Sequence, residues 1–174
     1  MKLNELNLDK TLRVSHIDCD GILPIILDKF FEIPYAYTIC TNYGEDLELV
    51  SLQSGIYESV IYTDFTPSEI CQKEIIDKGI NCIILDHHIA SKEEMEKFCN
   101  DYNKAEYIFD NEKCGTKIYY EWLKEQGYKG NDVSDYIVIL TNTYDLYKQD
   151  DENWNMAEQC NRLLYATALW SYKT

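Results

Sequence analysis

Residues 83–88 of this chain read Ile-Ile-Leu-Asp-His-His, and this stretch decides the expected fold. A short aliphatic run that ends in a carboxylate and two imidazoles is typical of a buried parallel strand. Open α/β sheets bind their ligands at the carboxyl ends of such strands. We therefore expect Asp86, His87 and His88 to lie at the carboxyl edge of a parallel sheet.

Other segments end in the same kind of residue. A strand-like segment near the N-terminus carries His16, Asp18 and Asp20, and the strand-like run of residues 60–64 ends in Asp64. An apolar stretch with helical character then contributes Asp145. Because these acids and imidazoles come from segments spread over most of the chain, the pattern predicts one shared metal-binding site.

Strand-like and helix-like patterns alternate through the first two thirds of the chain, which is typical of βαβ units. We expect strands over residues 11–18, 34–40, 59–64, 81–86 and 106–109, and helices over residues 22–31, 66–78, 91–101, 116–126, 133–147 and 155–170. Residues 42–53 are ambiguous, because the alternation of Leu47 and Leu49 allows a strand. The prediction is one α/β domain over residues 1–174, with a mostly parallel sheet flanked by helices.

Two helix starts carry capping signals. Thr66 precedes a proline and is followed three residues later by Glu69, which predicts Thr66 as the N-cap and Pro67 as the first helical residue. Ser91 precedes Glu94 in the same register. Gly79 is expected to end the first of these two helices.

Composition limits the class of protein. The chain has a formal net charge of −15 and no basic stripe of the kind that holds long nucleic acid. Its seven cysteines form no CxxC pair, which favours free thiols in a reducing compartment over a zinc ribbon. No run has the length of a membrane span, so we expect a cytoplasmic protein without a membrane partner. The acidity indicates a small phosphorylated substrate, or a partner domain that carries the basic surface.

The site residues favour a particular metal chemistry. His16, Asp18 and Asp20 are spaced at i, i+2 and i+4, which places them on one side of an extended segment. Several carboxylates with one or two imidazoles suit Mn²⁺ or Mg²⁺. About six such ligands suffice for two ions bridged by an aspartate, and such a pair promotes in-line phosphoryl displacement by water.

These motifs, taken together and in order, resemble the four motifs of the DHH phosphoesterase superfamily. They are His16-Ile-Asp18-Cys-Asp20-Gly21, the strand-ending Asp64, Asp86-His87-His88 and the downstream Asp145. That superfamily includes RecJ-type single-strand exonucleases, phosphodiesterases of short oligonucleotides and cyclic dinucleotides, and the related manganese pyrophosphatases. The resemblance covers residues 12 to about 147.

The resemblance implies a metal-ligand set. Asp18 and Asp20 would each bind one of two Mn²⁺ ions, and Asp64 would bridge them. His87 and Asp145 would complete the shell of the second ion. His16 occupies the position of a ligand or near-ligand in the family.

The resemblance also implies two residues with catalytic roles. Asp86 would accept a hydrogen bond that orients a histidine ring, and His88 would contact the scissile phosphate. The implied activity is divalent-metal-dependent hydrolysis of phosphodiester bonds in a small nucleotide or a short single-stranded nucleic acid. Hydrolysis of a phosphoanhydride such as pyrophosphate and a non-catalytic nucleotide-binding or metal-binding module are the alternatives.

Two features depart from the family pattern. Family members usually carry a C-terminal substrate domain, and we expect none within this chain. The fourth motif reads Asn142-Thr143-Tyr144-Asp145 in place of a compact Asp-Thr-Gly. The chain is therefore either a piece of a longer protein or a minimal form whose cleft a homodimer closes.

Simpler interpretations accompany these predictions. Asp18 and Asp20 alone fit an ordinary turn, and His87-His88 alone fits a solvated loop. Gly115 and Thr116 open an expected helix, whose N-terminus either binds a substrate phosphate or is a plain cap.

Overall fold

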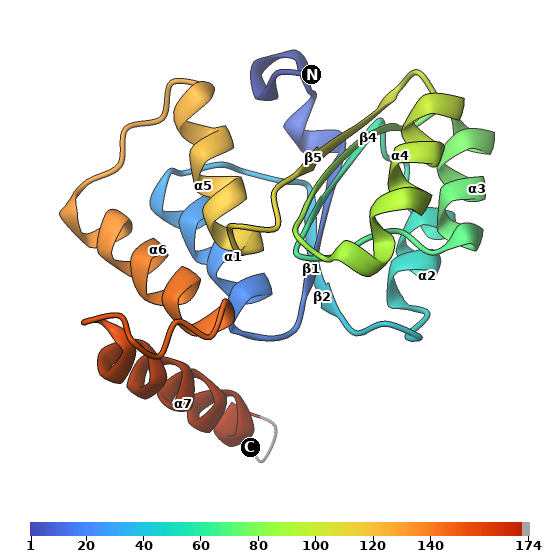
Figure 1. Ribbon diagram of the computed structural model, residues 1–174. Helices are drawn as coiled ribbons and strands as arrows, with labels where there is room; N and C mark the ends of the chain where they lie inside the picture. The colour runs from blue at the N-terminus through green and yellow to red at the C-terminus, as the bar shows by residue number, and fades with distance from the viewer. Residues whose placement is uncertain (172–174) are drawn as a thin grey trace.

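The computed structural model describes the backbone of residues 1–171 and the side chains of residues 1–166. Within these residues, one sheet has the strand order β2-β1-β3-β4-β5, and every neighbouring pair is parallel (Figure 1). The strands are β1 (Thr11–His16), β2 (Tyr37–Thr41), β3 (Ser59–Thr63), β4 (Asn81–Asp86) and β5 (Ala105–Phe109). The predicted α/β fold with a parallel sheet is confirmed.

Helices cover both faces of this sheet. The α-helices are α1 (Cys19–Phe30), α2 (Leu47–Ser54), α3 (Glu69–Lys78), α4 (Lys92–Asp101), α5 (Gly115–Glu125), α6 (Asp132–Asp145) and α7 (Trp154–Ser171). Short 3₁₀ turns are η1 (Leu3–Glu5), η2 (Leu8–Lys10) and η3 (Ile89–Ser91). Figure 1 shows α2, α3 and α4 on one face and α1, α5 and α6 on the other.

The central strands are apolar along their whole length because both of their faces are buried. Val60 and Tyr62 of β3 face one hydrophobic cluster with Ile75 of α3, whereas Ile61 faces the other cluster with Leu123 of α5. All five side chains are fully buried. This explains why β3 and β4 read as continuous aliphatic runs and not as alternating patterns.

The strand order places a topological switch point between β1 and β3. The chain leaves β1 toward α1 on one face and leaves β3 toward α3 on the opposite face, and β1 and β3 are neighbours. In doubly wound sheets this reversal separates the loops at the carboxyl ends of the two strands and leaves room for a ligand. The polar ends of β1 and β3 therefore lie at this switch point.

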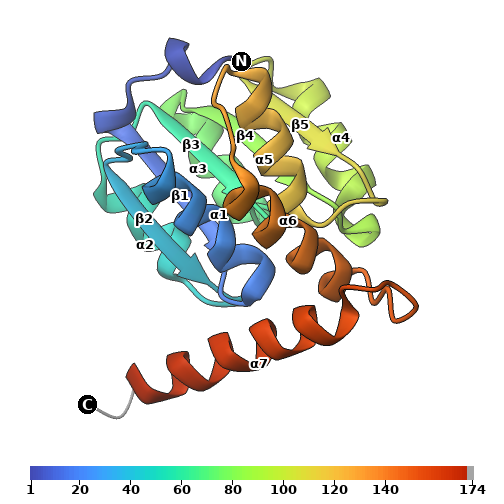
Figure 2. The ribbon, with the colours of Figure 1, turned by 90° about the vertical axis from the view of Figure 1, so that its left-hand side faces the viewer.

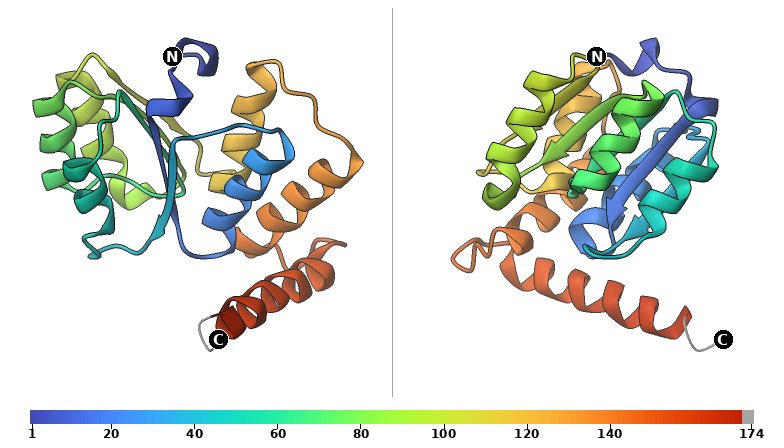
Figure 3. Two further views of the ribbon diagram at one scale, coloured as in Figure 1. Left: turned by 180° about the vertical axis from the view of Figure 1, so that it is seen from behind. Right: turned by 90° about the vertical axis from the view of Figure 1, so that its right-hand side faces the viewer.

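Helix α7 lies beyond this carboxyl edge. Figures 2 and 3 show it as a long helix set apart from the sheet, on the side toward which the strands run. Its side chains Ala157 and Asn161 are buried, so the helix packs against the domain over part of its length. None of the helices in residues 1–171 combines the length and the hydropathy needed to cross a membrane.

Residues 42–53 do not form the strand that the sequence left open. They lead into α2, in which the buried side chains Glu48 and Leu52 are four residues apart, while Leu47 and Val50 are exposed. This spacing places the two buried side chains on one face of a helix. The alternation of Leu47 and Leu49 was misleading, because Leu47 faces solvent.

One of the two predicted N-caps was wrong. The cap of α3 is Ser68, whose hydroxyl accepts a hydrogen bond from the Cys71 amide, so Thr66 lies two residues before it. Ser91 is the N-cap residue of α4, as predicted, but its hydroxyl donates to Asp86 Oδ2 at 3.0 Å and makes no cap hydrogen bond. Gly79 does end α3, with a left-handed φ of 68°.

A buried carboxyl group in α2 predicts a pH dependence of stability. Burial raises the pKa of Glu48 to about 7, and the hydrogen bond from the Tyr62 hydroxyl only partly opposes this shift. Because the pKa is higher in the folded state than in the unfolded state, the protonated carboxyl stabilises the fold at low pH. That stabilisation is lost as the pH rises from about 4.5 to about 7.

Glu48→Gln removes this titration. Relative to the variant, the natural chain is expected to lose up to about 3 kcal/mol of unfolding free energy between these pH values. Urea unfolding of both proteins at several pH values measures the difference. Parallel stability profiles over this range would contradict the expectation.

Candidate metal centre

All eight predicted metal-binding and catalytic residues lie at the carboxyl edge of the sheet. Residues from the ends of β1, β3 and β4 meet residues from the start of α1 and the end of α6. They form three overlapping groups, in each of which the candidate ligand atoms lie within 4.8 Å of one another. The groups are Asp64, Asp86, His87 and His88; His16, Asp18 and Asp64; and Asp20, His87 and Asp145.

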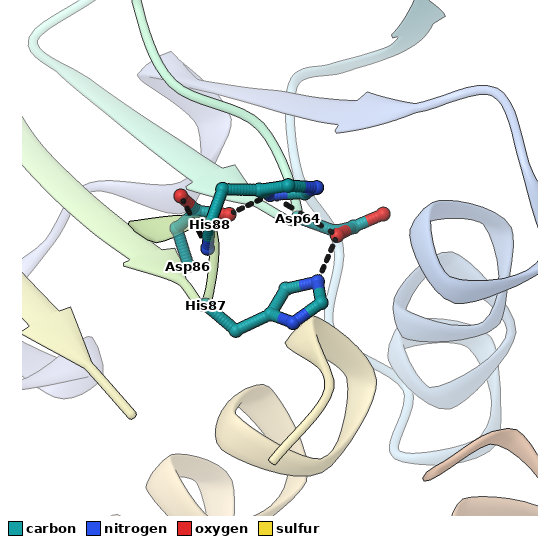
Figure 4. A group of neighbouring side chains, drawn as sticks. All are labelled: Asp64, Asp86, His87 and His88. Atoms are coloured by element: carbon teal, nitrogen blue, oxygen red, sulfur yellow. Dashed lines mark hydrogen bonds and ion pairs between the residues drawn. The ribbon is translucent and has the colours of Figure 1, made fainter. Parts of the chain in front are cut away.

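The imidazole of His87 lies among three carboxylates. Its Nε2 atom is 3.2 Å from Asp64 Oδ1, 3.6 Å from Asp145 Oδ2 and 3.7 Å from Asp20 Oδ2. Figure 4 shows the ring of His87 turned toward Asp64 and away from Asp86. Burial lowers the pKa of His87, which favours the neutral imidazole that a metal ion requires.

His16 and Asp18 face Asp64 from the other side. His16 Nδ1 is 2.8 Å from Asp18 Oδ2 and 3.8 Å from Asp64 Oδ2. Asp64 therefore belongs both to this group and to the group of Asp64, Asp86, His87 and His88. A carboxylate with one oxygen toward each group has the arrangement that bridging two cations requires.

The three residues of the first motif do not lie along one extended segment, contrary to the prediction from their spacing. Strand β1 ends at His16, Asp18 is the N-cap of α1 and accepts from the Gly21 amide at 2.9 Å, and Asp20 lies in the first helical turn. A Cβ atom on Gly21 would lie 2.1 Å from the His16 carbonyl oxygen. Glycine is therefore required for the tight turn that brings these side chains together.

Asp86 is fully buried and holds His88. Asp86 Oδ1 is 2.7 Å from His88 Nδ1, and Oδ2 accepts from the His88 amide at 3.3 Å. The Ser91 hydroxyl donates to the same carboxylate. These contacts fix the His88 ring and leave its Nε2 atom directed away from Asp86 (Figure 4). The Asp86 hydrogen bond raises the pKa of His88.

The N-terminus of α5 contacts the site through Asp20. The amides of Gly115 and Thr116 donate to Asp20 Oδ2 and Oδ1 at 2.6 and 2.8 Å, and the Thr116 hydroxyl donates to the Asp20 carbonyl oxygen. The helix end thus orients a carboxylate of the site. Binding of substrate phosphate by Gly115 and Thr116 stays a prediction.

Asp64 has an unusual backbone conformation. Its φ is +52°, in the left-handed region that non-glycine residues rarely adopt. The start of α5 packs closely against it, because a Cβ atom on Gly115 would lie 2.6 Å from Asp64 Cβ. Such strained positions persist only where the surroundings enforce them. Here the left-handed backbone of Asp64 directs its buried carboxylate into the centre of the site.

The electrostatics of the centre fit a cation. Burial and the neighbouring carboxylates of Asp20 and Asp18 raise the pKa of Asp64 well above its usual value, and the same causes raise the pKa of Asp145 to about 7. Among the described residues, Asp64 Oδ2 and Asp145 Oδ2 are buried acceptors without a hydrogen-bond partner. Buried acceptors that repel one another are stabilised by a bound divalent ion, so the donor set suits Mn²⁺ or Mg²⁺.

Sequence reasoning missed one residue of this region. Asn161 of α7 is 4% exposed, and its Oδ1 atom is buried without a hydrogen-bond partner. It lines a cavity of about 50 Å³ together with Asp18, Asp20 and Asp145. The only signal in the sequence is an amide side chain at a position of α7 that faces the domain. That Asn161 lies near these acids depends on the tertiary fold.

Fold and site together define a parallel α/β domain with a carboxylate–imidazole centre suited to divalent cations. No family model matches the chain. It is 25% identical over 173 residues to a protein named 3',5'-cyclic-nucleotide phosphodiesterase from Helicobacter pylori. The match covers 87% of this chain and 47% of that protein. The chain thus spans about half the length of this curated relative.

A crystal structure of an uncharacterized protein from Helicobacter pylori G27 has a similar fold. The TM-score is 0.68 at 24% sequence identity, and the match covers 90% of this chain and 49% of that one. At this identity the similarity supports the fold alone.

Proposed function

We propose that this chain is a divalent-metal-dependent phosphodiesterase of the DHH type that hydrolyses short or single-stranded nucleotide substrates with two Mn²⁺ ions. One observation carries the proposal: Asp64 and His87 each belong to two of the three overlapping groups of acids and imidazoles. The name of the curated relative, a cyclic-nucleotide phosphodiesterase, supports the same reaction type.

The proposed division of roles follows the geometry. His16, Asp18 and Asp64 would hold one ion, and Asp20, His87 and Asp145 the other, with Asp64 shared. When bound, such ions supply a nucleophilic water at neutral pH and offset the charge of the phosphate oxygens. His88 lies at the rim with its ring held by Asp86, so it would donate a hydrogen bond to the phosphate.

Metal binding has a measurable consequence for stability. With free Mn²⁺ about 100-fold above its dissociation constant, the folded state gains about 2.7 kcal/mol, or roughly 5–10 °C in melting temperature. Thermal melting with Mn²⁺, and again after chelation with EDTA, tests this. A melting temperature that does not respond to Mn²⁺ or Mg²⁺ would contradict the metal centre.

Activity is tested in the same titration with bis(4-nitrophenyl) phosphate as a reporter. Mn²⁺-dependent turnover together with stabilisation supports the phosphodiesterase. Stabilisation without turnover would contradict catalysis by this chain and support the binding module. Comparing a dinucleotide with pyrophosphate as substrates then separates the proposed function from phosphoanhydride hydrolysis.

A further inference from the structure

A pocket of about 580 Å³ opens directly beside His88. We call it the side pocket. It lies between the segments that follow β2, β3 and β4, and its lining includes Tyr43, Phe65, Pro67, Ile70, His88 and Ser91. His88 Nδ1 is 3.9 Å from Asp64 Oδ1, so one side chain separates the side pocket from the metal centre. A group bonded to a phosphate at the centre therefore reaches the pocket.

The side pocket has an aromatic wall that the fold holds in place. The rings of Tyr43 and Phe65 stack with centroids 4.4 Å apart and an interplanar angle of 22°. Phe65 is buried and also stacks on His16, so this pair is anchored to the metal centre. Tyr43 is 53% exposed, and Ile70, another lining residue of the side pocket, is 64% exposed. These open apolar surfaces provide a platform on which a planar ring stacks.

The charge of the side pocket limits what binds there. Four exposed carboxylate residues contribute to its lining, and His88 is its one imidazole, with no lysine or arginine among the lining residues. The four are Glu45, Asp46, Glu69 and Glu94, and the buried Glu48 is bonded to Tyr62. Carboxylates at this density repel a phosphate, whereas they accept hydrogen bonds from the N–H groups of a base.

We propose that the side pocket is the nucleoside subsite of this centre, with the base stacked on Tyr43 and the phosphate at the metal ions. The inference rests on the proposed function and narrows its substrate class. The occupant of the pocket is an uncharged nucleoside attached to the scissile phosphate. A further phosphate on that nucleoside gains nothing in this acidic pocket, which separates the expected substrates from polyphosphates.

The test measures binding by isothermal titration to the Mn²⁺-loaded protein. Tyr43→Ala is expected to weaken the binding of adenosine 5'-monophosphate roughly 5- to 100-fold, the range for loss of one base-stacking contact. Tyr43→Phe keeps the ring and is expected to bind like the natural chain. Tyr37 of β2 is equally exposed, at 53%, and does not line the pocket, so Tyr37→Ala is the matched control.

Inorganic phosphate and adenosine 3',5'-bisphosphate complete the design. Phosphate affinity reports on the metal centre and is expected to be the same in all four proteins. The bisphosphate is expected to bind no tighter than the monophosphate. Equal binding of the monophosphate by Tyr43→Ala and the natural chain would overturn the subsite, as would an equal loss for phosphate.

Failure of the nucleoside subsite can be distinguished from failure of the proposed function. If the reporter is not hydrolysed but monophosphate binding depends on Tyr43, catalysis fails and the subsite stands as a binding site. If the reporter is hydrolysed and binding does not depend on Tyr43, the function stands and the subsite fails.

Discussion

Replacing Asp64 with alanine is expected to lower Mn²⁺-dependent hydrolysis of bis(4-nitrophenyl) phosphate by about 1000-fold or more. Asp64 lies between the two histidines of the centre, with Oδ1 3.2 Å from His87 Nε2 and Oδ2 3.8 Å from His16 Nδ1. Its loss would remove a ligand from both proposed ions at once. Loss of any other single ligand would remove a ligand from only one of the two proposed ions.

The backbone of Asp64 decides which variant is the cleaner test. At a φ of +52°, alanine is strained by about 1–2 kcal/mol, whereas asparagine tolerates the left-handed region. Asp64→Asn keeps the shape and removes the charge, so it is expected to fold and to lose activity equally. Without metal it should melt no lower than the natural chain, because it relieves repulsion from Asp20 and Asp18.

The control for Asp64→Asn is Asp150→Asn. Asp150 is exposed and belongs to none of the three groups, so its variant is expected to keep both the activity and the Mn²⁺-induced rise in melting temperature. For Asp64→Asn, circular dichroism confirms the fold before activity is measured. Retained Mn²⁺-dependent hydrolysis in a folded Asp64→Asn protein would refute the bridging role.

The residues of the candidate site were predictable where they stand at the carboxyl end of a strand that the local sequence itself predicts. Asp64 follows an aliphatic strand and Asp86 ends one, and the carboxyl ends of parallel strands meet at one edge regardless of strand order. The strand order itself has no local signature. For the same reason the placement of α1 and α3 on opposite faces of the sheet, which defines the switch point, appears only in the folded chain.

Other features escaped prediction because they depend on partners distant in sequence. In the sequence, nothing distinguishes Tyr43 from any other exposed tyrosine. Its proposed role depends on its stacking on Phe65 in the fold. Asn161 reaches the acids only because α7 lies across the carboxyl edge. Asp18 is brought to His16, and Asp20 to His87, by a helical turn that their even spacing does not reveal.

The second large expected effect is on stability and concerns the buried ion pair of Arg13 and Asp28. Arg13 of β1 is fully buried, with Nε 3.2 Å from Asp28 Oδ2 and its guanidinium centred 4.6 Å from the Tyr119 ring. Nη1 donates to the Val14 carbonyl oxygen at 3.0 Å, and the Tyr119 hydroxyl donates to Asp28. Asp28 is 4% exposed, so the carboxylate depends on these two partners.

Arg13→Met is expected to destabilise the fold by about 3–5 kcal/mol, because it leaves a buried carboxylate without its cation. This is a large part of the roughly 5–15 kcal/mol that stabilises a typical domain. The double variant Arg13→Met/Asp28→Leu removes both charges and is expected to recover most of the loss. Urea unfolding of the two single variants and the double variant closes the thermodynamic cycle.

The same variants separate the scaffold from the metal centre. Arg13 and Asp28 are absent from the three candidate metal groups, so well below its melting temperature Arg13→Met should bind Mn²⁺ as the natural chain does. A loss of stability below about 1 kcal/mol would show that the buried pair contributes little. A weakened Mn²⁺ affinity in the folded variant would show instead that β1 transmits the strain to His16. Since β1 carries Arg13 and ends at His16, this measurement decides whether the centre depends on the core or only on its own ligands.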